Sequence, residues 1–198
     1  MPSWCENEVE IYGDRKTIKK IKQEVFTKAE DIGADQEEYS YLDFDKVIPM
    51  PQELVDTKAP PTIVSEEVIR MRDLLKANPS IQSIWLEDTT AGFYRHLKLD
   101  EWSEKYMSER QSEILKKTYG ADNWYDWRLT NWGTKWGIDG ESVHFYHEDD
   151  ESIQISFSTA WSPPEEVARN LRWKYENEDD FAMRWFYRED DMEFSGYL

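Results

Sequence analysis

The feature of this sequence that most constrains its fold is a strict alternation close to the N-terminus, between Glu6 and Tyr12. Three glutamates fall on one face of the extended chain, and three largely apolar side chains fall on the other. The two sets are Glu6, Glu8 and Glu10, and Asn7, Val9 and Ile11. A period of two residues predicts a strand that is buried on one face only. The chain therefore needs a sheet with one face against a core and the other open to water.

One helix and three further strands are predicted around a long middle segment. Asp14 is placed to cap a helix whose apolar stripe recurs at helical spacing. That stripe consists of Ile18, Ile21, Val25 and Phe26. Residues 39–48 predict a second strand, which two prolines end. Residues 143–147 and 153–158 predict a hairpin across an acidic turn.

The C-terminal part continues with a helix and a closing strand. Ser162, followed by two prolines and Glu165, predicts a capping box at the start of the helix. The buried faces of the helix and of the closing strand would consist of Val167, Leu171 and Tyr175, and of Met183, Trp185 and Tyr187. The order β-α-β followed by β-hairpin-α-β is the ferredoxin-like plan of two split βαβ halves. We therefore predict an α+β fold, an antiparallel sheet with helices on one face.

A helical insertion is predicted between the two halves, at residues 52–122. Helical periodicity covers 65–77 and 100–119, each beginning with a residue suited to N-capping, and Gly120 is placed to end the second helix. No linker rich in Pro, Gly or Ser separates this segment from the rest. We expect 1–198 to form a single domain that includes the insertion.

The chain is strongly acidic, with 42 Asp and Glu against 24 Lys and Arg and a formal net charge of −18. Such a charge opposes binding to a polyanion. The outward glutamates of the first strand would also repel a phosphate backbone, which differs from the aromatic and basic sheets that bind RNA. We expect no direct contact with nucleic acid and a basic or neutral partner.

Composition also bears on the compartment. The single Cys5 excludes an internal disulfide. No apolar run approaches the length of a membrane-spanning helix, and the first residues lack the basic and then apolar layout of a signal peptide. We expect a cytoplasmic protein with no membrane contact and no cofactor. At 198 residues, 39% of them hydrophobic, the chain can fill one sizeable core.

The charge is unevenly spread along the chain. The predicted helix at 14–28 is basic, whereas the acidic residues are densest late in the sequence, where turns are predicted. The acidic candidates for contact with a partner are Glu148, Asp149, Asp150 and Glu151, and Glu178, Asp179 and Asp180. Two interpretations stay open, namely solvated loops and a surface that binds a basic protein.

Four of the ten tryptophans lie within residues 123–137. Trp132 and Trp136 flank a short stretch in which Lys135 can place its charge beside aromatic rings. This group is either a pocket that binds a partner or the packing of the sheet against the insertion. Trp161 is interpreted as a staple for the helix that follows it.

Four segments of the chain carry a resemblance to a known family. They are Trp4-Cys5-Glu6-Asn7, Ile48-Pro49-Met50-Pro51, Trp132-Gly133-Thr134-Lys135-Trp136 and Thr159-Ala160-Trp161-Ser162-Pro163-Pro164. In order and over most of the chain, they resemble the YubB-type family, a ferredoxin-like family of phage and plasmid proteins whose function is largely uncharacterised. The resemblance implies a ferredoxin-like fold and an origin in a mobile element, and it assigns no catalytic residue.

A catalytic role would need residues in a recognisable arrangement. Asp43 and Asp45 share a face if 39–48 is a strand, and two carboxylates can then hold a divalent cation. His144 and His147 would point to opposite faces of a strand because their spacing is odd, which disfavours a shared metal. The sequence contains no nucleophile elbow, phosphate loop or CxxC motif.

Two classes of function stay open. The first is a non-catalytic acidic binding protein of a phage or plasmid that engages a basic, DNA-binding protein, as a DNA mimic or an inhibitor of a host defence system. The second is a small metal-dependent enzyme or processing factor that uses Asp43 and Asp45. The sequence indicates neither the identity of the partner nor the oligomeric state.

Overall fold

The chain divides into two compact units in a computed structural model, and each unit is described by itself. Unit 1 combines Met1–Pro49 with Arg128–Leu198, and unit 2 is Met50–Trp127. The residues that the structure describes are 3–29, 40–138, 141–190 and 193–198. Within these ranges, none of the helices has the length and apolar character needed to cross a lipid bilayer.

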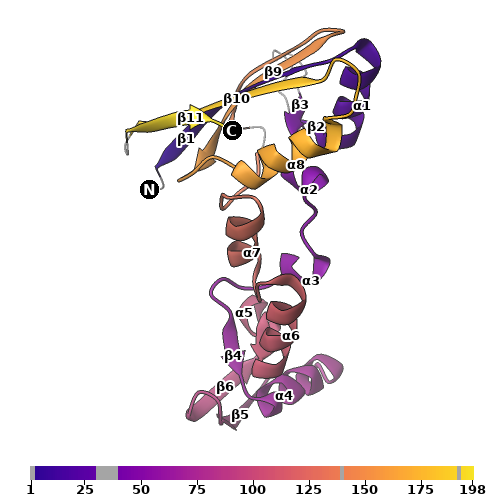
Figure 1. The fold of residues 1–198 in the computed structure, drawn as a ribbon. Helices are drawn as coiled ribbons and strands as arrows, with labels where there is room; N and C mark the ends of the chain where they lie inside the picture. The colour runs from indigo at the N-terminus through magenta and orange to yellow at the C-terminus, as the bar shows by residue number, and fades with distance from the viewer. Residues whose placement is uncertain (1–2, 30–39, 139–140, 191–192) are drawn as a thin grey trace. The chain divides into compact units, whose positions relative to one another are not determined.

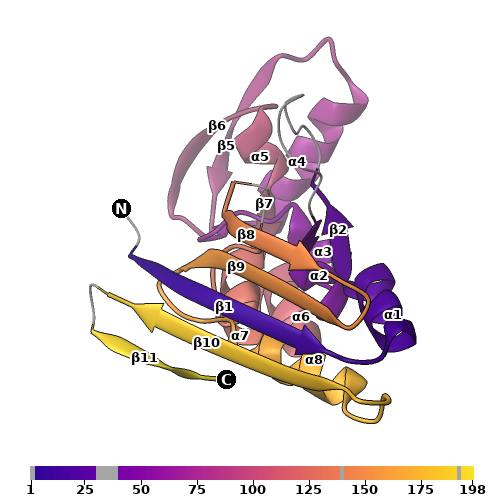
Figure 2. The same ribbon diagram turned by 90° about the horizontal axis from the view of Figure 1, so that it is seen from above.

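Unit 1 contains a five-stranded antiparallel sheet and helices that cover one of its faces (Figures 1 and 2). Its elements are β1 (Trp4–Tyr12), α1 (Arg15–Val25), β2 (Phe26–Lys28), β3 (Ser40–Leu42), α2 (Phe44–Val47), β8 (Val143–Glu148), β9 (Ser152–Ala160), α8 (Glu165–Tyr175), β10 (Ala182–Glu189) and β11 (Phe194–Tyr197). The sheet has the strand order β11-β10-β1-β9-β8. A further helix, α7 (Trp124–Asn131), runs across the boundary of the two units.

The connections of the sheet are those of a ferredoxin-like domain. The series β1-α1-β8-β9-α8-β10 is the β-α-β-β-α-β order of that fold. The strand pairs β10–β1, β1–β9 and β9–β8 are all antiparallel. The predicted fold class is therefore confirmed. β8 provides the second strand of this plan, and β11, which the sequence did not predict, extends the sheet beyond β10.

The two faces of β1 follow the predicted alternation. Four of its residues are at most 1% exposed, and they are Cys5, Asn7, Val9 and Ile11. The glutamates lie on the open face, where Glu8 is opposite Ser156 of β9 and Phe186 of β10. The predicted inner faces of α1 and α8 are buried as well. The Asp14 carboxylate caps α1 by accepting the Thr17 amide at 2.7 Å.

Two predictions of secondary structure and capping in unit 1 are wrong. The strand predicted at 39–48 is observed only as β3, which pairs with β2 outside the main sheet, and α2 follows it at once. The first predicted residue, Tyr39, lies outside the described ranges. The capping box at Ser162 does not form, because α8 begins after Pro164 and the Ser162 hydroxyl donates to the carbonyl of Gly133 at 2.5 Å.

Unit 2 contains short strands as well as helices. Its elements are α3 (Gln52–Val55), β4 (Thr62–Val64), α4 (Glu66–Ala77), β5 (Ser83–Asp88), β6 (Phe93–Lys98), α5 (Glu101–Glu104), β7 (Tyr106–Ser108) and α6 (Glu109–Tyr119). The helix predicted at 65–77 is confirmed as α4, with Ser65 as its N-cap. The helix predicted at 100–119 is broken by β7, which pairs in parallel with β4. Ser108 and Gln111 then form a capping box for α6, and Gly120 ends it.

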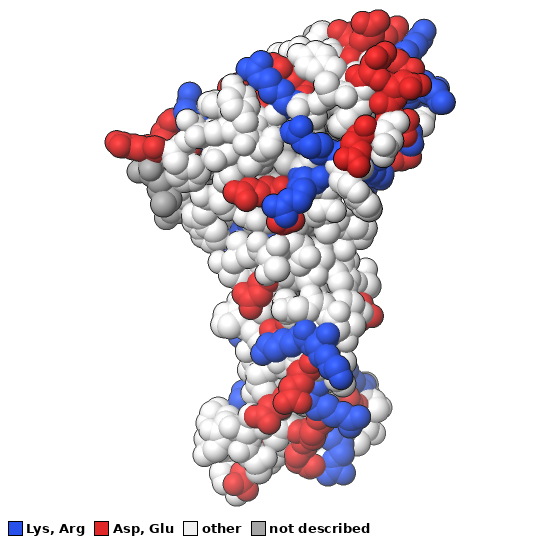
Figure 3. Space-filling model, viewed as in Figure 1, with Lys and Arg blue, Asp and Glu red and all other residues white. Residues whose placement is uncertain are grey.

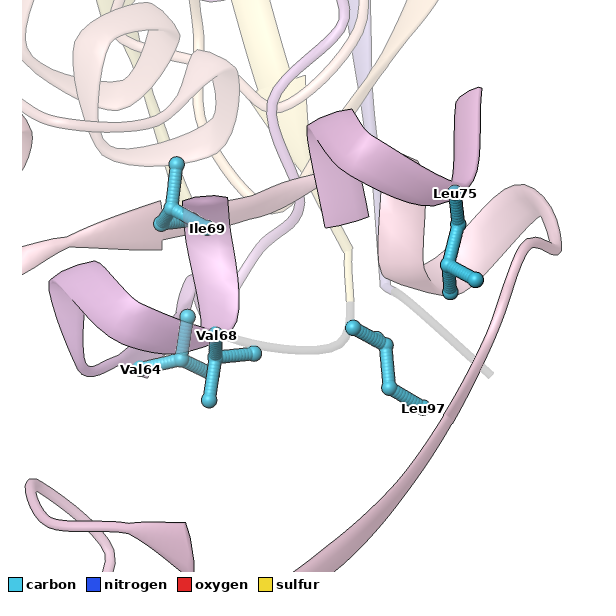
Figure 4. Packing of buried hydrophobic residues seen from close by; sticks show 5 residues of the cluster. All are labelled: Val64, Val68, Ile69, Leu75 and Leu97. Carbon is cyan, nitrogen blue, oxygen red and sulfur yellow. The ribbon is translucent and has the colours of Figure 1, made fainter. Parts of the chain in front are cut away.

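A small core holds unit 2 together. Its buried residues come from β4, α4 and β6 and are drawn in Figure 4; they are Val64, Val68, Ile69, Leu75 and Leu97. Beside this core, the buried carboxylate of Asp88 accepts the Ser65 amide at 3.0 Å and pairs with Arg95 at 2.8 Å. These bonds satisfy a charge that would otherwise be costly to bury.

Candidate functional site

Three tryptophans from separate parts of unit 1 form a stack at the start of β1. The ring centroids of Trp4 and Trp136 are 6.3 Å apart, as are those of Trp136 and Trp161, with planes inclined by 27° and 26°. The ammonium of Lys135 lies 4.1 Å from the centroid of Trp136 and 5.6 Å from that of Trp161. Each indole is more than a third exposed. This tryptophan stack is a surface on which planar or cationic groups can bind.

Hydrogen bonds fix the two segments that provide Trp136 and Trp161. Thr134 Oγ1 donates to the Ala160 carbonyl at 3.0 Å, and Ser162 Oγ donates to the Gly133 carbonyl. The backbones approach closely here, since a Cβ added at Gly133 would lie 3.1 Å from the carbonyl oxygen of Pro163. The φ of Gly133 is +83°, which also favours glycine.

Trp132 is buried near this site, at the start of the same segment. It is only 3% exposed, packs edge-on against Phe44 with centroids 5.9 Å apart, and donates its Nε1 proton to the Ile48 carbonyl at 2.9 Å. Trp136 is 39% exposed and Lys135 is half-buried. The structure thus brings Lys135 and Trp136 together at the surface, whereas Trp132 is part of the buried core beside Phe44.

The backbone at Trp161 has an unusual conformation. Its φ is +68°, in the left-handed region that bulky residues rarely adopt. The Ser162 amide donates to the Ala160 carbonyl at 3.0 Å and closes a three-residue turn around Trp161. The Trp161 amide donates to the Ser3 carbonyl at 3.0 Å. Strained residues of this kind persist only where the surroundings hold them, and they cluster at functional sites.

A buried asparagine joins the start of β1 to the end of β9. Asn7 Nδ2 donates to the Cys5 carbonyl at 2.9 Å and to Thr159 Oγ1 at 3.0 Å, and Asn7 Oδ1 accepts the Trp185 indole proton at 3.1 Å. Residues of all four segments that carry the family resemblance are therefore linked by hydrogen bonds or ring contacts. The four segments that carry the resemblance therefore lie together in the fold.

A cavity of about 400 Å³ lies beside Trp4. It is lined by Trp4, Glu6, Glu141, Ser142, His144 and Ser158 and is called the Glu6 pocket below. Ser158 Oγ donates to Glu6 Oε1 at 2.9 Å, and His144 Nε2 lies 2.5 Å from Ser158 Oγ and 3.4 Å from Glu6 Oε2. A second hollow of about 240 Å³ shares part of this lining and extends to Trp136.

The polar group in the Glu6 pocket is not arranged as a catalytic triad. In a Ser-His-acid triad the serine and the acid bind opposite nitrogens of the imidazole. Here Ser158 and Glu6 both lie at Nε2 of His144. Because the Ser158 hydroxyl donates to Glu6, we assign the Nε2 proton to His144 as a donor to Ser158, so the imidazole cannot accept the proton of Ser158. The geometry suits binding rather than nucleophilic attack.

The two histidines of β8 lie on the same face, contrary to the sequence prediction. A β-bulge at the start of β8 shifts the register, so that His144 contacts Glu6 while His147 is opposite Gln154, which faces Glu10. Glu6 and Glu10 are four residues apart on β1, roughly 13 Å, so one metal cannot reach both histidines. Over the described ranges, the structure contains no group of three or more His, Cys, Asp or Glu that could hold a metal ion.

Asp43 and Asp45 do not form the arrangement that the sequence suggested. Asp43 is the N-cap of α2, and its carboxylate accepts the Asp45 amide at 3.1 Å and the Thr27 hydroxyl at 2.8 Å. Asp45 is exposed in the first turn and interacts electrostatically with Arg128. The shared face was predicted from a strand, and the chain is helical here.

The two acidic turns both lie at the opposite end of β1. The Gly13 amide donates to the Glu151 carbonyl at 3.1 Å, and Thr17 Oγ1 donates to the Asp179 carbonyl at 3.4 Å, so both turns lie against the start of α1. We call these turns the acidic end surface. It consists of Glu148, Asp149, Asp150, Glu151, Glu178, Asp179 and Asp180.

The basic residues of α1 pair with this surface. The ion pairs are Arg15 with Asp150 at 3.4 Å, Lys20 with Glu178 at 2.5 Å, and Lys22 with Glu148. Figure 3 shows the red and blue side chains gathered at the α1 end of unit 1. Burial would raise the pKa of Glu148, but hydrogen bonds from Lys22 and Tyr146 outweigh this and keep that pKa below its ordinary value.

The match to a protein family agrees with the fold. Residues 140–198 match a family described as "Ferredoxin-like domain in Api92-like protein", and this part contains β8, β9, α8, β10 and β11. The crystal structure of protein api92 from Yersinia pseudotuberculosis is similar at 13% sequence identity, with a TM-score of 0.44, over 100% of this chain and 93% of that chain. No curated protein is significantly similar. The chain thus has a ferredoxin-like domain, and the matched family does not carry the YubB-type name.

Proposed function

We propose that this chain is a non-catalytic binding protein whose acidic end surface engages a basic partner protein. The observation that carries the proposal is that two acidic turns, distant in sequence, both lie against the start of α1. The surface contributes seven carboxylates, whereas Arg15–Val25 offers five cations on the adjacent helix. Its charge stays negative even when all five are counted.

The ion pairs at this surface do not prevent binding. Arg15 and Asp150 are 81% and 70% exposed, and exposed pairs of this kind contribute only about 0–1 kcal/mol. A partner that brings an arginine or lysine can therefore replace Arg15 at little cost. The field of the turns also attracts a basic protein over roughly a Debye length, about 8–10 Å at physiological salt.

The resemblance to YubB-type proteins supports a more specific form of the proposal. In this form the protein belongs to a phage or plasmid and acts in the cytoplasm of the bacterial host. Its partner is a DNA-binding protein, whose nucleic-acid surface is occupied by the acidic end surface as a mimic of DNA. Inhibition of a host defence system would follow if that partner is a nuclease or restriction subunit.

The test is capture of host proteins on the immobilised chain, with elution by a salt gradient or by duplex DNA. A triple variant, Glu151→Gln, Asp179→Asn and Asp180→Asn, removes three charges from the acidic end surface. Asparagine tolerates the φ of +56° at position 180. A matched control removes three exposed carboxylates from unit 2 and consists of Asp56→Asn, Glu87→Gln and Glu113→Gln.

We expect capture of a DNA-binding protein that salt and DNA release, loss of this capture in the end-surface variant, and retention in the control. Equal loss in both variants would show that total charge alone is responsible. Capture that neither salt nor DNA reverses would refute mimicry.

A further inference from the structure

We propose that the Glu6 pocket binds the guanidinium group of an arginine side chain on a partner protein. The pocket lies at the first residues of β1, whereas the acidic end surface lies beyond its last residues. The inference is therefore independent of the function proposed above.

The aromatic wall of the pocket suits a planar cation. Trp4 lines the pocket, is 48% exposed, and is held by its contact with Trp136. The tryptophan stack already attracts one cation within the molecule, because the Lys135 ammonium lies 4.1 Å from the Trp136 centroid. Guanidinium groups stack on indole faces more readily than compact, strongly hydrated ammonium groups.

The polar part of the pocket offers an oriented carboxylate. Glu6 is held by Ser158 and His144, yet 41% of its side chain is exposed. Arg188 is directly opposite Glu6 on β10, but its guanidinium pairs with Asp190 at 2.9 Å. Glu6 therefore presents a fixed acceptor to a cation from outside the chain.

The remaining lining completes the match. Glu141, Ser142 and Ser158 complete the lining, which therefore contains a second carboxyl group and two hydroxyl groups beside Glu6. A guanidinium has five donors in one plane, which several acceptors around a cavity can satisfy together. A volume of about 400 Å³ leaves room for a guanidinium group. The net charge of −18 further favours a cation over a neutral or anionic group.

The experiment follows the indole N–H signals of the ¹⁵N-labelled full chain by NMR during titration with N-acetyl-arginine methylamide. The Trp4 signal is assigned from its absence in Trp4→Phe. N-acetyl-citrulline methylamide is the neutral, nearly isosteric control, and N-acetyl-lysine methylamide tests the preference for a planar cation. Glu6→Gln removes the charge in the pocket, and Glu8→Gln is the matched variant because Glu8 lies on the same face of β1, two residues further along.

We expect the arginine probe to shift the Trp4 signal with a dissociation constant on the order of millimolar, and citrulline to leave it unchanged. Glu6→Gln should weaken binding about tenfold, as expected for one charge-assisted hydrogen-bonded pair, while Glu8→Gln should not. The dispersion of the spectra verifies that each variant is folded. Equal shifts with citrulline, equal weakening in both glutamate variants, or stronger binding of the lysine probe would overturn the proposal.

Discussion

Replacing Asn7 with leucine should destabilise unit 1 far more than the loss of one surface hydrogen bond. Asn7 is fully buried and joins the Cys5 carbonyl, Thr159 Oγ1 and the Trp185 indole. Leucine has a similar volume but leaves the Trp185 N–H, itself in a residue that is 0% exposed, without its acceptor. An orphaned buried donor costs about 1–3 kcal/mol, and the lost bonds of the amide add about 1 kcal/mol. We expect a decrease of about 2–4 kcal/mol in the free energy of unfolding.

The interaction of Asn7 with Trp185 can be isolated by a double-mutant cycle. Trp185→Phe removes the donor, so the Asn7→Leu, Trp185→Phe double variant should cost about 1–2 kcal/mol less than the sum of the single variants. Ser156→Ala, on the open face of β9, is the control and should change stability by less than about 0.5 kcal/mol.

Because the chain has two compact units, the measurement needs a probe inside unit 1. Cys5 is that probe, since it is buried in β1 and is the single cysteine. Pulses of a thiol reagent over a urea series report its exposure. A decrease below about 0.5 kcal/mol for Asn7→Leu, or additive single and double variants, would refute the argument for a buried network.

Three further predictions concern backbone, charge and the thiol. Gly133→Ala should lower the free energy of unfolding, measured in urea, more than Gly120→Ala does. Both glycines have a positive φ, which costs alanine about 1 kcal/mol. Only at Gly133 would the added Cβ also crowd the backbone, because it would lie 3.1 Å from the Pro163 carbonyl oxygen. Burial would raise the pKa of Asp88, but hydrogen bonds from the Ser65 amide and from Arg95 outweigh this and lower that pKa. The ionised carboxylate therefore stabilises the folded state fully above the ordinary pKa of 3.8, and this stabilisation is lost as the pH falls through the lower folded pKa. Thermal unfolding between pH 7 and pH 2 should show this loss, and Asp88→Asn should reduce it, whereas an unchanged pH profile would contradict it. Burial and the nearby carboxylates of Glu189 and Glu6 raise the pKa of Cys5 to about 11, so alkylation at pH 8 should be slow in the native protein and fast in urea.

The parts of the fold that the sequence predicted are those in which one face of a single element is buried. The alternation of β1 and the stripe of α1 are signals of this kind, because each burial pattern repeats within one element. The residues of α8 behave in the same way. The prediction is wrong where a residue type suits two local structures. Asp43 fits the predicted strand at 39–48, but in the structure it is the N-cap of α2.

The hairpin of β5 and β6 in unit 2 was missed for a related reason. Trp85 and Tyr94 are 67% and 70% exposed on its outer face, so apolar residues occur on both faces and the alternation is hidden. The bulge in β8 is equally invisible in the sequence, because it follows from pairing with β9. Pairing between distant segments decides both features.

The candidate site shows why a likeness between whole segments can be informative where periodicity is not. The bonds Thr134–Ala160, Trp132–Ile48 and Asn7–Thr159 span 26, 84 and 152 residues, so no local pattern predicts them. Each bond nevertheless needs a particular donor side chain, from Thr134, Trp132 or Asn7, and both partners of every bond lie in the four segments that carry the resemblance. These hydrogen bonds depend on individual side chains in fixed positions, whereas a periodic pattern depends only on hydrophobicity.

That geometry combines a strained residue with exposed aromatic surface. Trp161 adopts a left-handed backbone conformation, and such strain costs on the order of 1–3 kcal/mol. The three rings bury part of their surface in return, but Trp4, Trp136 and Trp161 keep 48%, 39% and 38% of their surface exposed. If packing were the only role of these rings, smaller residues in ordinary conformations would fill the same space with less strain. A rigid, hydrogen-bonded support that holds three indoles in solvent beside an oriented carboxylate is better suited to recognition, and this favours a ligand at the Glu6 pocket.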